Sequence, residues 1–387
     1  MTVTVRLPCK AGGVEEYSLR EPVGWTHPKS PLRCRIAFAA AHVAADPRGE
    51  NSPGAPAVID WDSTLAFRRH LWSYGLGLAE AMDTAQRGMG LDWVATQELV
   101  RRSATEARAL GARVAAGAGT DHADAHLTSL DDVVAAYEEQ VEVIDGTGAQ
   151  VILMASRQLA AMARSTDDYR MVYDRLLSQV RQPVILHWLG PMFDPALAGY
   201  WGSPDIEEAT DAFLSLIVDH AAVVDGVKVS LLDADHEVRL RARLPEGVRL
   251  YTGDDYNFPD LIKGDGRRSS DALLGVFAAI APAASAALQA LDRGDVADFD
   301  AAMGPTVPLG RHLFSAPTFY YKTGIAFLAW LAGHQPGFSM VGGLQSARSV
   351  PHLVEAFRLA DEVGLLPDPD LAAHRMRTFL QVAGFAP

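Results

Sequence analysis

The sequence is poor in cysteine, since Cys9 and Cys34 are the two thiols among its 387 residues. Their spacing fits neither a zinc site nor a disulfide framework, and no signal peptide precedes them. No apolar run reaches the ~18 residues that a membrane-spanning helix needs. The longest weakly polar stretch, residues 277–291, is rich in alanine and contains Pro282. These absences predict a cytoplasmic protein in a reducing compartment, without a membrane partner.

Basic residues are also in deficit. Lys and Arg together number 34 against 48 Asp and Glu, which gives a net charge of −14. A nucleic-acid-binding protein presents a basic face to the phosphate backbone, so we expect no nucleic-acid partner. Hydrophobic residues make up 49% of the chain, and a chain this long can bury a core that needs no disulfide or structural metal.

Three glycine-based motifs are missing. No Gly-x-Gly-x-x-Gly follows an early strand, which argues against a dinucleotide-binding fold. The sequence has no Gly-x-Ser-x-Gly, which argues against the hydrolases that use this motif. Gly342 and Gly343 predict a turn and not a phosphate loop, because no helix-opening Lys-Ser/Thr follows them. Nothing in the sequence calls for an organic cofactor.

What the sequence does contain is an alternation of short apolar runs with longer helical patterns. The predicted strands are residues 34–42, 75–82, 112–119, 149–154, 183–188, 223–229, 247–252 and 272–279. A helical pattern follows most of these runs, and the first helix is predicted to be capped by Asp62 or Ser63. Repeated strand–helix units imply a parallel sheet. Eight of them in about 250 residues predict a (β/α)8 TIM barrel.

The two ends of the chain follow other patterns. Residues 1–33 are rich in proline and predict an N-terminal arm, in which residues 3–7 alternate like an edge strand. After the barrel, at 34–280, the pattern is helical only, with helices predicted at 283–293, 295–303, 317–333, 347–363 and 368–383. Residues 281–387 therefore predict a C-terminal helical extension packed on the barrel.

In a barrel of this kind the reacting groups lie at the carboxyl ends of the strands. Polar residues gather at these predicted ends: His42, Glu80, Asp83, Thr84, Asp121, His122, Ser156, Arg157, His187, Trp188, Lys228, Asp254 and Asp255. Lys228 is the most informative of them, because it ends a run of β-branched residues. A lysine buried there would lose its proton readily and become a nucleophile towards carbonyl carbons. The alternative is a strand-end lysine that extends its ammonium into solvent.

The order of these features resembles the dihydrodipicolinate synthase and N-acetylneuraminate lyase superfamily of class I, Schiff-base aldolases. Val-Asp-Gly-Val-Lys at 224–228 is similar to the strand-six lysine motif of that family, and Leu-Tyr-Thr-Gly-Asp-Asp at 250–255 is similar to its strand-seven segment. Leu-Asp-Arg-Gly-Asp at 291–295 is similar to its helical tail. The resemblance implies that Lys228 forms an imine with a keto substrate and that Lys322 can reach the barrel mouth. It also implies a homodimer or homotetramer.

Departures from the family pattern bear on the substrate. Where the family has Gly-Thr-Thr-Gly-Glu to hold a carboxylate, the chain has Met-Asp-Thr-Ala-Gln at 82–86, which keeps only Thr84. Asp83 would repel a carboxylate unless Arg87 offsets it. His187 stands where the family has its proton-relaying tyrosine, and a histidine can do the same work at neutral pH. We therefore expect a keto acid or a hydroxylated keto-sugar derivative, with substrate-binding roles for Asp83, Thr84, Trp188, Asp254 and Asp255.

Two other functions remain open on the same barrel. His122 and His126, with His187 and Asp254 at other strand ends, could hold a divalent metal in a sugar isomerase, epimerase or aldolase. The barrel could also bind a ligand without turning it over, since one architecture hosts many functions.

Overall fold

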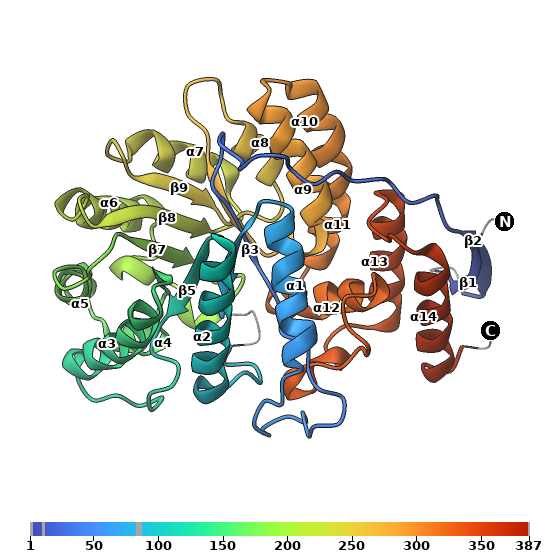
Figure 1. Ribbon diagram of the computed structural model, residues 1–387. Helices are drawn as coiled ribbons and strands as arrows, with labels where there is room; N and C mark the ends of the chain where they lie inside the picture. The colour runs from blue at the N-terminus through green and yellow to red at the C-terminus, as the bar shows by residue number, and fades with distance from the viewer. Residues whose placement is uncertain (1–2, 10–11, 83–86, 386–387) are drawn as a thin grey trace.

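The centre of the molecule is a closed barrel of eight parallel strands (Figure 1). The computed structural model describes residues 3–9, 12–82 and 87–385. In the order in which they neighbour one another, the strands are β10 (Asp271–Leu274), β3 (Ala37–Ala40), β4 (Gly77–Glu80), β5 (Val114–Ala118), β6 (Gln150–Leu153), β7 (Val184–Leu189), β8 (Val224–Ser230) and β9 (Arg249–Thr252). Pairing of β10 with both β9 and β3 closes the ring. The predicted (β/α)8 barrel is confirmed.

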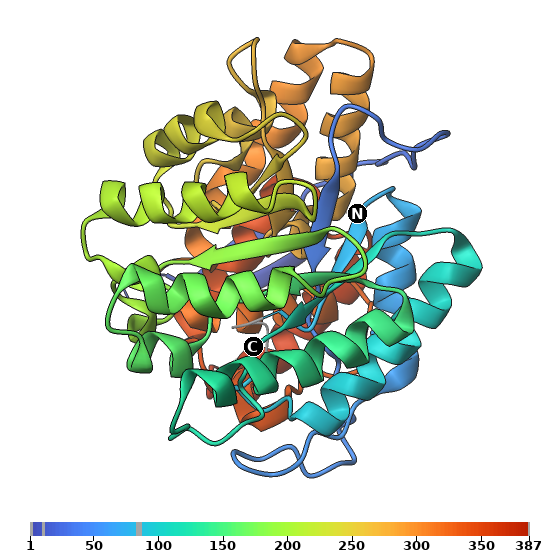
Figure 2. The same cartoon turned by 90° about the vertical axis from the view of Figure 1, so that its left-hand side faces the viewer.

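Helices alternate with the strands and form a ring around them (Figures 1 and 2). Their bounds are α1 (Trp61–Ser73), α2 (Trp93–Leu110), α3 (Leu130–Thr147), α4 (Arg157–Met162), α5 (Thr166–Leu177), α6 (Ile206–Asp219), α7 (Ala234–Arg243), α8 (Phe258–Lys263) and α9 (Phe277–Asp292). The N-cap of α1 is Asp60, and the predicted caps Asp62 and Ser63 are wrong. The Asp60 carboxylate accepts hydrogen bonds from both the backbone N–H and the hydroxyl of Ser63, so Ser63 lies inside the first turn.

The two faces of each strand pack against different parts of the molecule. Side chains that point inward fill the barrel with apolar residues such as Phe38, Ile152, Ile185 and Tyr251. Side chains that point outward join the larger core between the barrel and its helices. Because both faces are buried, the strands read as continuous apolar runs with little alternation.

The C-terminal helices gather on one side of the barrel (Figure 1). They are α10 (Val296–Met303), α11 (Val307–Leu313), α12 (Tyr321–Leu331), α13 (Val350–Glu362) and α14 (Pro369–Val382). In this part of the chain α11 was not expected, and the last barrel strand ends at Leu274 instead of 279. The strand stops beside Gly275, where a β-carbon would overlap the rings of Phe314 and Tyr321, and the alanine-rich residues that follow form α9.

The N-terminal arm forms a hairpin on the far side of these helices. Its strands β1 (Thr4–Pro8) and β2 (Val14–Ser18) pair antiparallel, so the arm contains two strands where one was predicted. The hairpin is anchored to α13 by the Tyr17 hydroxyl, which donates to the Asp361 carboxylate at 2.8 Å. None of the described helices is long and apolar enough to cross a membrane. The division of the chain into arm, barrel and extension stays a prediction.

A buried ion pair joins the barrel to its first helix. The Arg68 guanidinium of α1 donates to both carboxylate oxygens of Glu80 at the end of β4, at 3.0 and 2.7 Å, and both side chains are at most 1% exposed. The Ser103 hydroxyl of α2 donates to the same carboxylate at 2.6 Å. Glu80 therefore points into the helix layer and not into the barrel mouth.

We expect either Arg68→Met or Glu80→Met alone to lower the free energy of unfolding by ~3–5 kcal/mol, since each leaves one buried charge without its partner. The double variant, which removes both charges, should lose less than the sum of the two single losses. Urea denaturation followed by circular dichroism measures all three. A double variant that loses the full sum would show that the two side chains stabilise the fold independently.

Candidate active site

The carboxyl ends of the barrel strands bring Lys228 and His187 side by side. They are register partners on the adjacent strands β8 and β7. Both face inward, because His187 lies two residues after the interior residue Ile185 on the same face of β7. His187 is 1% exposed and Lys228 is 8% exposed. The lysine is therefore buried, as the nucleophile interpretation requires, and does not extend into solvent.

Gly253, the residue after β9, makes room for this arrangement. A β-carbon at this position would lie 2.1 Å from the Ser230 hydroxyl oxygen and 3.1 Å from Cε of Lys228. The Ser230 hydroxyl in turn lies 3.2 Å from Nε2 of His187. Lys228 and Ser230 of β8 are thus packed against the bare backbone that follows β9, and His187 of β7 lies beside the serine. Ser230 was not singled out from the sequence.

Asp255 is the carboxylate at the end of β9. Burial raises its pKa to about 7, against the opposing influence of a hydrogen bond from the Val276 backbone N–H and of the positive charge of Lys228. The Val276 N–H donates to Oδ1 at 2.8 Å, which fixes the carboxyl across the ends of β9 and β10. Asp255 is therefore an acid that can hold or release a proton near neutral pH.

Its neighbour Asp254 stabilises the loop between β9 and α8. Oδ1 of Asp254 accepts from the backbone N–H groups of Tyr256 and Asn257, at 2.8 and 3.0 Å. Oδ2 accepts from the Asn257 side-chain amide at 2.9 Å. These contacts occupy both oxygens and shape the turn that leads into α8. The expected role of Asp254 in binding substrate stays a prediction.

Trp188 lies in the helix layer. It follows His187 and points to the opposite face of β7, where its ring packs against Phe213 and His236, with centroid distances of 5.3 and 5.5 Å. The expected contact of Trp188 with a sugar face stays a prediction. The other two expected substrate-binding residues, Asp83 and Thr84, lie outside the described residues.

Lys322, which belongs to the C-terminal extension, lies at the same end of the barrel. It lies at the start of α12 and is 2% exposed, and its ammonium donates to the Ala40 carbonyl at the end of β3. Burial lowers its pKa to about 7, although Asp255 acts in the other direction. The signal in the sequence is a single lysine inside an otherwise apolar helix.

The structure does not bring the four residues of the metal alternative together. His122 is engaged by the Gln140 side-chain amide at 2.7 Å and by Glu139 at 3.1 Å, and His126 is exposed in the loop before α3. His187 lies beside Ser230, and Asp254 is held in its own loop. Among residues 3–9, 12–82 and 87–385, no group of three or more His, Cys, Asp or Glu side chains is placed to hold a metal ion.

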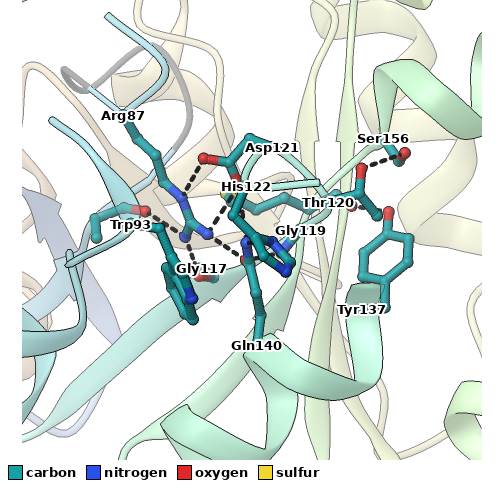
Figure 3. Close-up of polar contacts among 12 residues, drawn as sticks. Arg87, Trp93, Gly117, Gly119, Thr120, Asp121, His122, Tyr137, Gln140 and Ser156 are labelled. Atoms are coloured by element: carbon teal, nitrogen blue, oxygen red, sulfur yellow. Dashed lines mark hydrogen bonds and ion pairs between the residues drawn. The ribbon is translucent and has the colours of Figure 1, made fainter. Parts of the chain in front are cut away.

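A second polar cluster, around Arg87, joins the end of β5 to the middle of α3 (Figure 3). The Arg87 guanidinium donates to the Asp121 carboxylate at 3.0 Å, to the Gly117 carbonyl and to the Gln140 side-chain oxygen. Burial acts to raise the pKa of Asp121, but the Arg87 charge outweighs it and the pKa lies below its usual range. The Gln140 oxygen also accepts from the Gly119 N–H at 2.6 Å. These contacts match the charge of Arg87 within the cluster and fix the loops on that side.

Comparison with solved structures identifies barrels of one kind. YagE, a prophage protein of the dihydrodipicolinic acid synthase family from E. coli K12 solved in complex with pyruvate, matches with a TM-score of 0.66 and 14% identity, covering 86% of this chain and 99% of that one. The dihydrodipicolinate synthase of Thermotoga maritima matches with a TM-score of 0.64 and 14% identity, over 86% and 100% of the two chains. That of Aquifex aeolicus gives 0.63 and 12%, over 86% and 99%. At these identities the likeness shows the fold, and it bears out the resemblance found in the sequence.

Two further comparisons concern the sequence itself. A search of curated proteins returned no match. One family model matches residues 5–385, almost the whole chain. The chain, which has the fold of the dihydrodipicolinate synthases, therefore belongs to the family described as "Protein of unknown function (DUF993)".

Proposed function

We propose that the protein is a class I lyase in which Lys228 forms an imine with the ketone group of a small substrate. The packing of Lys228 against Gly253, beside the His187–Ser230 pair, carries this proposal. A fixed and buried amine with a proton-transfer group next to it is what imine chemistry requires. The substrate is a keto acid or a hydroxylated keto-sugar derivative, and the pyruvate bound to the similar YagE barrel supports the first class.

The chemistry would begin at the Lys228 nitrogen. The amine adds to the ketone carbon, the carbonyl oxygen takes up a proton, and loss of the resulting hydroxyl as water leaves an iminium. In aldol cleavage a base removes the proton of the β-hydroxyl, an aldehyde leaves, and the electron pair of the broken carbon–carbon bond flows into the iminium to give an enamine. In dehydration the base removes the α-proton and the β-hydroxyl leaves as water. Protonation and hydrolysis of the imine by water then release the product and Lys228.

His187 would carry the protons of these steps. Its ring lies beside Lys228 across the β7–β8 pair, and the Ser230 hydroxyl within 3.2 Å of Nε2 can pass a proton onward. Asp255 would bind a substrate hydroxyl or tune the lysine. Asp83 and Thr84 keep their proposed roles in orienting the substrate. We further propose that the enzyme is cytoplasmic and assembles as a homodimer or homotetramer, with neither nucleic acid nor membrane as a partner.

The first test is borohydride trapping with a panel of keto acids and keto sugars. Reduction of the imine should increase the mass of the protein by that of the ketone less one oxygen atom, and peptide mapping should place the adduct on Lys228. Lys228→Ala should give no adduct. Lys263→Ala is the matched control, because Lys263 pairs with Asp300 at 2.9 Å on the outside of the molecule. An adduct that forms equally in Lys228→Ala, or no adduct with any ketone, would overturn the proposal.

Replacement of His187 tests the proton relay. We expect His187→Asn to lower kcat by ~10²–10⁴-fold, the usual contribution of a general acid–base group, while Lys228 still forms the trapped adduct at a slower rate. Ser230→Ala should have a smaller effect in the same direction. Steady-state kinetics with the ketone that gives most adduct measures both. If kcat remains unchanged in His187→Asn, another group carries the protons.

Gly253→Ala tests the packing of the lysine. The added β-carbon overlaps the Ser230 oxygen and crowds Lys228, so we expect trapping to fall at least ~10-fold through misplacement of the amine. Gly146→Ala is the control, since a β-carbon on this residue of α3 meets no atom within 4 Å. Unchanged trapping in both variants would mean that the close approach of Gly253 has no role in the chemistry.

A further inference from the structure

Lysine is scarce in this chain, and two of its lysines are buried at one place. The sequence contains five lysines, Lys10, Lys29, Lys228, Lys263 and Lys322, against 29 arginines, the remainder of its 34 basic residues. Lys29 is exposed and Lys263 is partly exposed. Lys228 and Lys322 are 8% and 2% exposed, and both lie at the carboxyl ends of the barrel strands. Most basic residues of the chain are arginines, so two buried lysines at the carboxyl ends of the barrel strands need an explanation.

Lys322 is poorly compensated for a buried charge. Its ammonium donates to one backbone carbonyl, that of Ala40, and in the described part of the chain no carboxylate lies within ion-pair distance of it. A buried ammonium without a close counter-charge destabilises the fold. Arg68, in the helix layer outside the barrel, shows the contrasting solution, since two of its nitrogens donate to the Glu80 carboxylate. Lys322 is therefore not explained by stability.

The order of the strands places Asp255 between the two lysines. Lys228 is on β8, Asp255 follows β9 and is bonded to Val276 after β10, and Lys322 contacts the end of β3. These are four consecutive strands of the barrel. The ring of Tyr321, the residue before Lys322, fills the space left by Gly275 at the end of β10, which holds the start of α12 against this part of the mouth. Asp255 is within electrostatic range of both amines.

Building on the lyase function proposed above, we propose that Lys228, Asp255 and Lys322 form a lysine–carboxylate–lysine cluster in which Lys322 acts as a positioning residue that keeps the Lys228 amine unprotonated near neutral pH. The two lysines then lie in the field of one carboxylate, which can balance only one of the two positive charges, so the cluster holds fewer protons than three separate groups would. A second cation near an imine-forming lysine favours its neutral, nucleophilic form. The raised pKa of Asp255 and the lowered pKa of Lys322, each about 7 and each caused first by burial, are consistent with such sharing.

Other charged groups face the cluster and have to stay constant in a test. The described titratable or charged side chains that act on its members include Asp254, His187, His42, Arg68 and Glu80. Arg68 and Glu80 neutralise each other. Burial lowers the pKa of His42 to about 3, so this ring is neutral. The variants below leave all five in place.

The direction in which the pH midpoint of Lys228 reactivity shifts can be predicted separately for the loss of Lys322 and for the loss of the Asp255 charge. Removing the Lys322 cation removes its repulsion of Lys228 and leaves the Asp255 charge to act on Lys228, which favours the protonated lysine. Removing the Asp255 charge has the opposite effect, because it takes away a negative charge that acts on Lys228. Lys322→Met should therefore raise the pH midpoint at which Lys228 becomes reactive by ~1 unit or more, and Asp255→Asn should lower it by a similar amount. The double variant should return close to the wild-type midpoint.

Reductive methylation with formaldehyde and cyanoborohydride measures this midpoint. Brief reactions between pH 6 and 10 are read by peptide mass at each lysine, and the fraction methylated at Lys228 is followed against pH. The exposed Lys29 serves as an internal control whose profile should be the same in every variant. Lys263→Met is the matched control for loss of a lysine. Circular dichroism and thermal melting establish that each variant is folded, and Asp255→Asn still tests the proposal if Lys322→Met does not fold.

Opposite shifts in Lys322→Met and Asp255→Asn support the cluster, since a merely structural role for either residue would not reverse sign between them. A Lys228 midpoint that stays unchanged in both variants, or moves in the same direction in both, overturns it. The assay needs no substrate. If no ketone is trapped on Lys228, the lyase function is wrong. If the pH midpoint of Lys228 does not shift, the cluster is wrong, whatever the trapping assay gives.

Discussion

The closed parallel barrel is the constraint on which the rest of the molecule depends. Its strands are only four to seven residues long, so one residue more or less decides whether a side chain reaches the mouth. Alternation along each strand then decides whether that side chain points into the mouth or into the helix layer. Lys228 and His187 meet because both conditions are fulfilled on adjacent strands. Glu80 and Trp188 fulfil the first condition and not the second.

Buried charged side chains lie on both sides of the barrel sheet, and they differ in how far their charges are matched by partners. On the outside, Arg68 and Glu80 satisfy each other through two hydrogen bonds, and Ser103 adds a third to the carboxylate. On the inside, Asp255 accepts from the Val276 backbone N–H, and Lys322 donates to the Ala40 carbonyl and lies 5.0 Å from the centroid of the Tyr321 ring. The outer pair fixes α1 on the barrel. The inner groups keep unused capacity to bind and release protons, which is the property that proton-transfer chemistry needs.

Some of this could be read from the sequence and some could not, for physical reasons. The strand–helix rhythm and the placing of Lys228 and His187 follow from local patterns, and they predicted the barrel and the core of the site. The face of Trp188 did not follow, because 184–189 is apolar on both sides and a parallel strand carries little alternation. The end of the last barrel strand was misplaced because a short apolar run does not distinguish strand from helix. The proximity of Lys322 to Lys228 depends on how α12 packs, which no local pattern records.

The hairpin of the N-terminal arm has a consequence for how the molecule is made. Tyr17 bonds to Asp361, a partner 344 residues further along the chain. During synthesis the hairpin leaves the ribosome before the barrel strands, and its docking surface on α13 leaves after them. The two strands of the hairpin therefore lack their docking surface, and their edges stay unprotected, while the barrel strands are synthesised. The contact between the hairpin and α13 can form only after α13 has been synthesised, so a chain truncated before α13 lacks the surface on which its own hairpin docks.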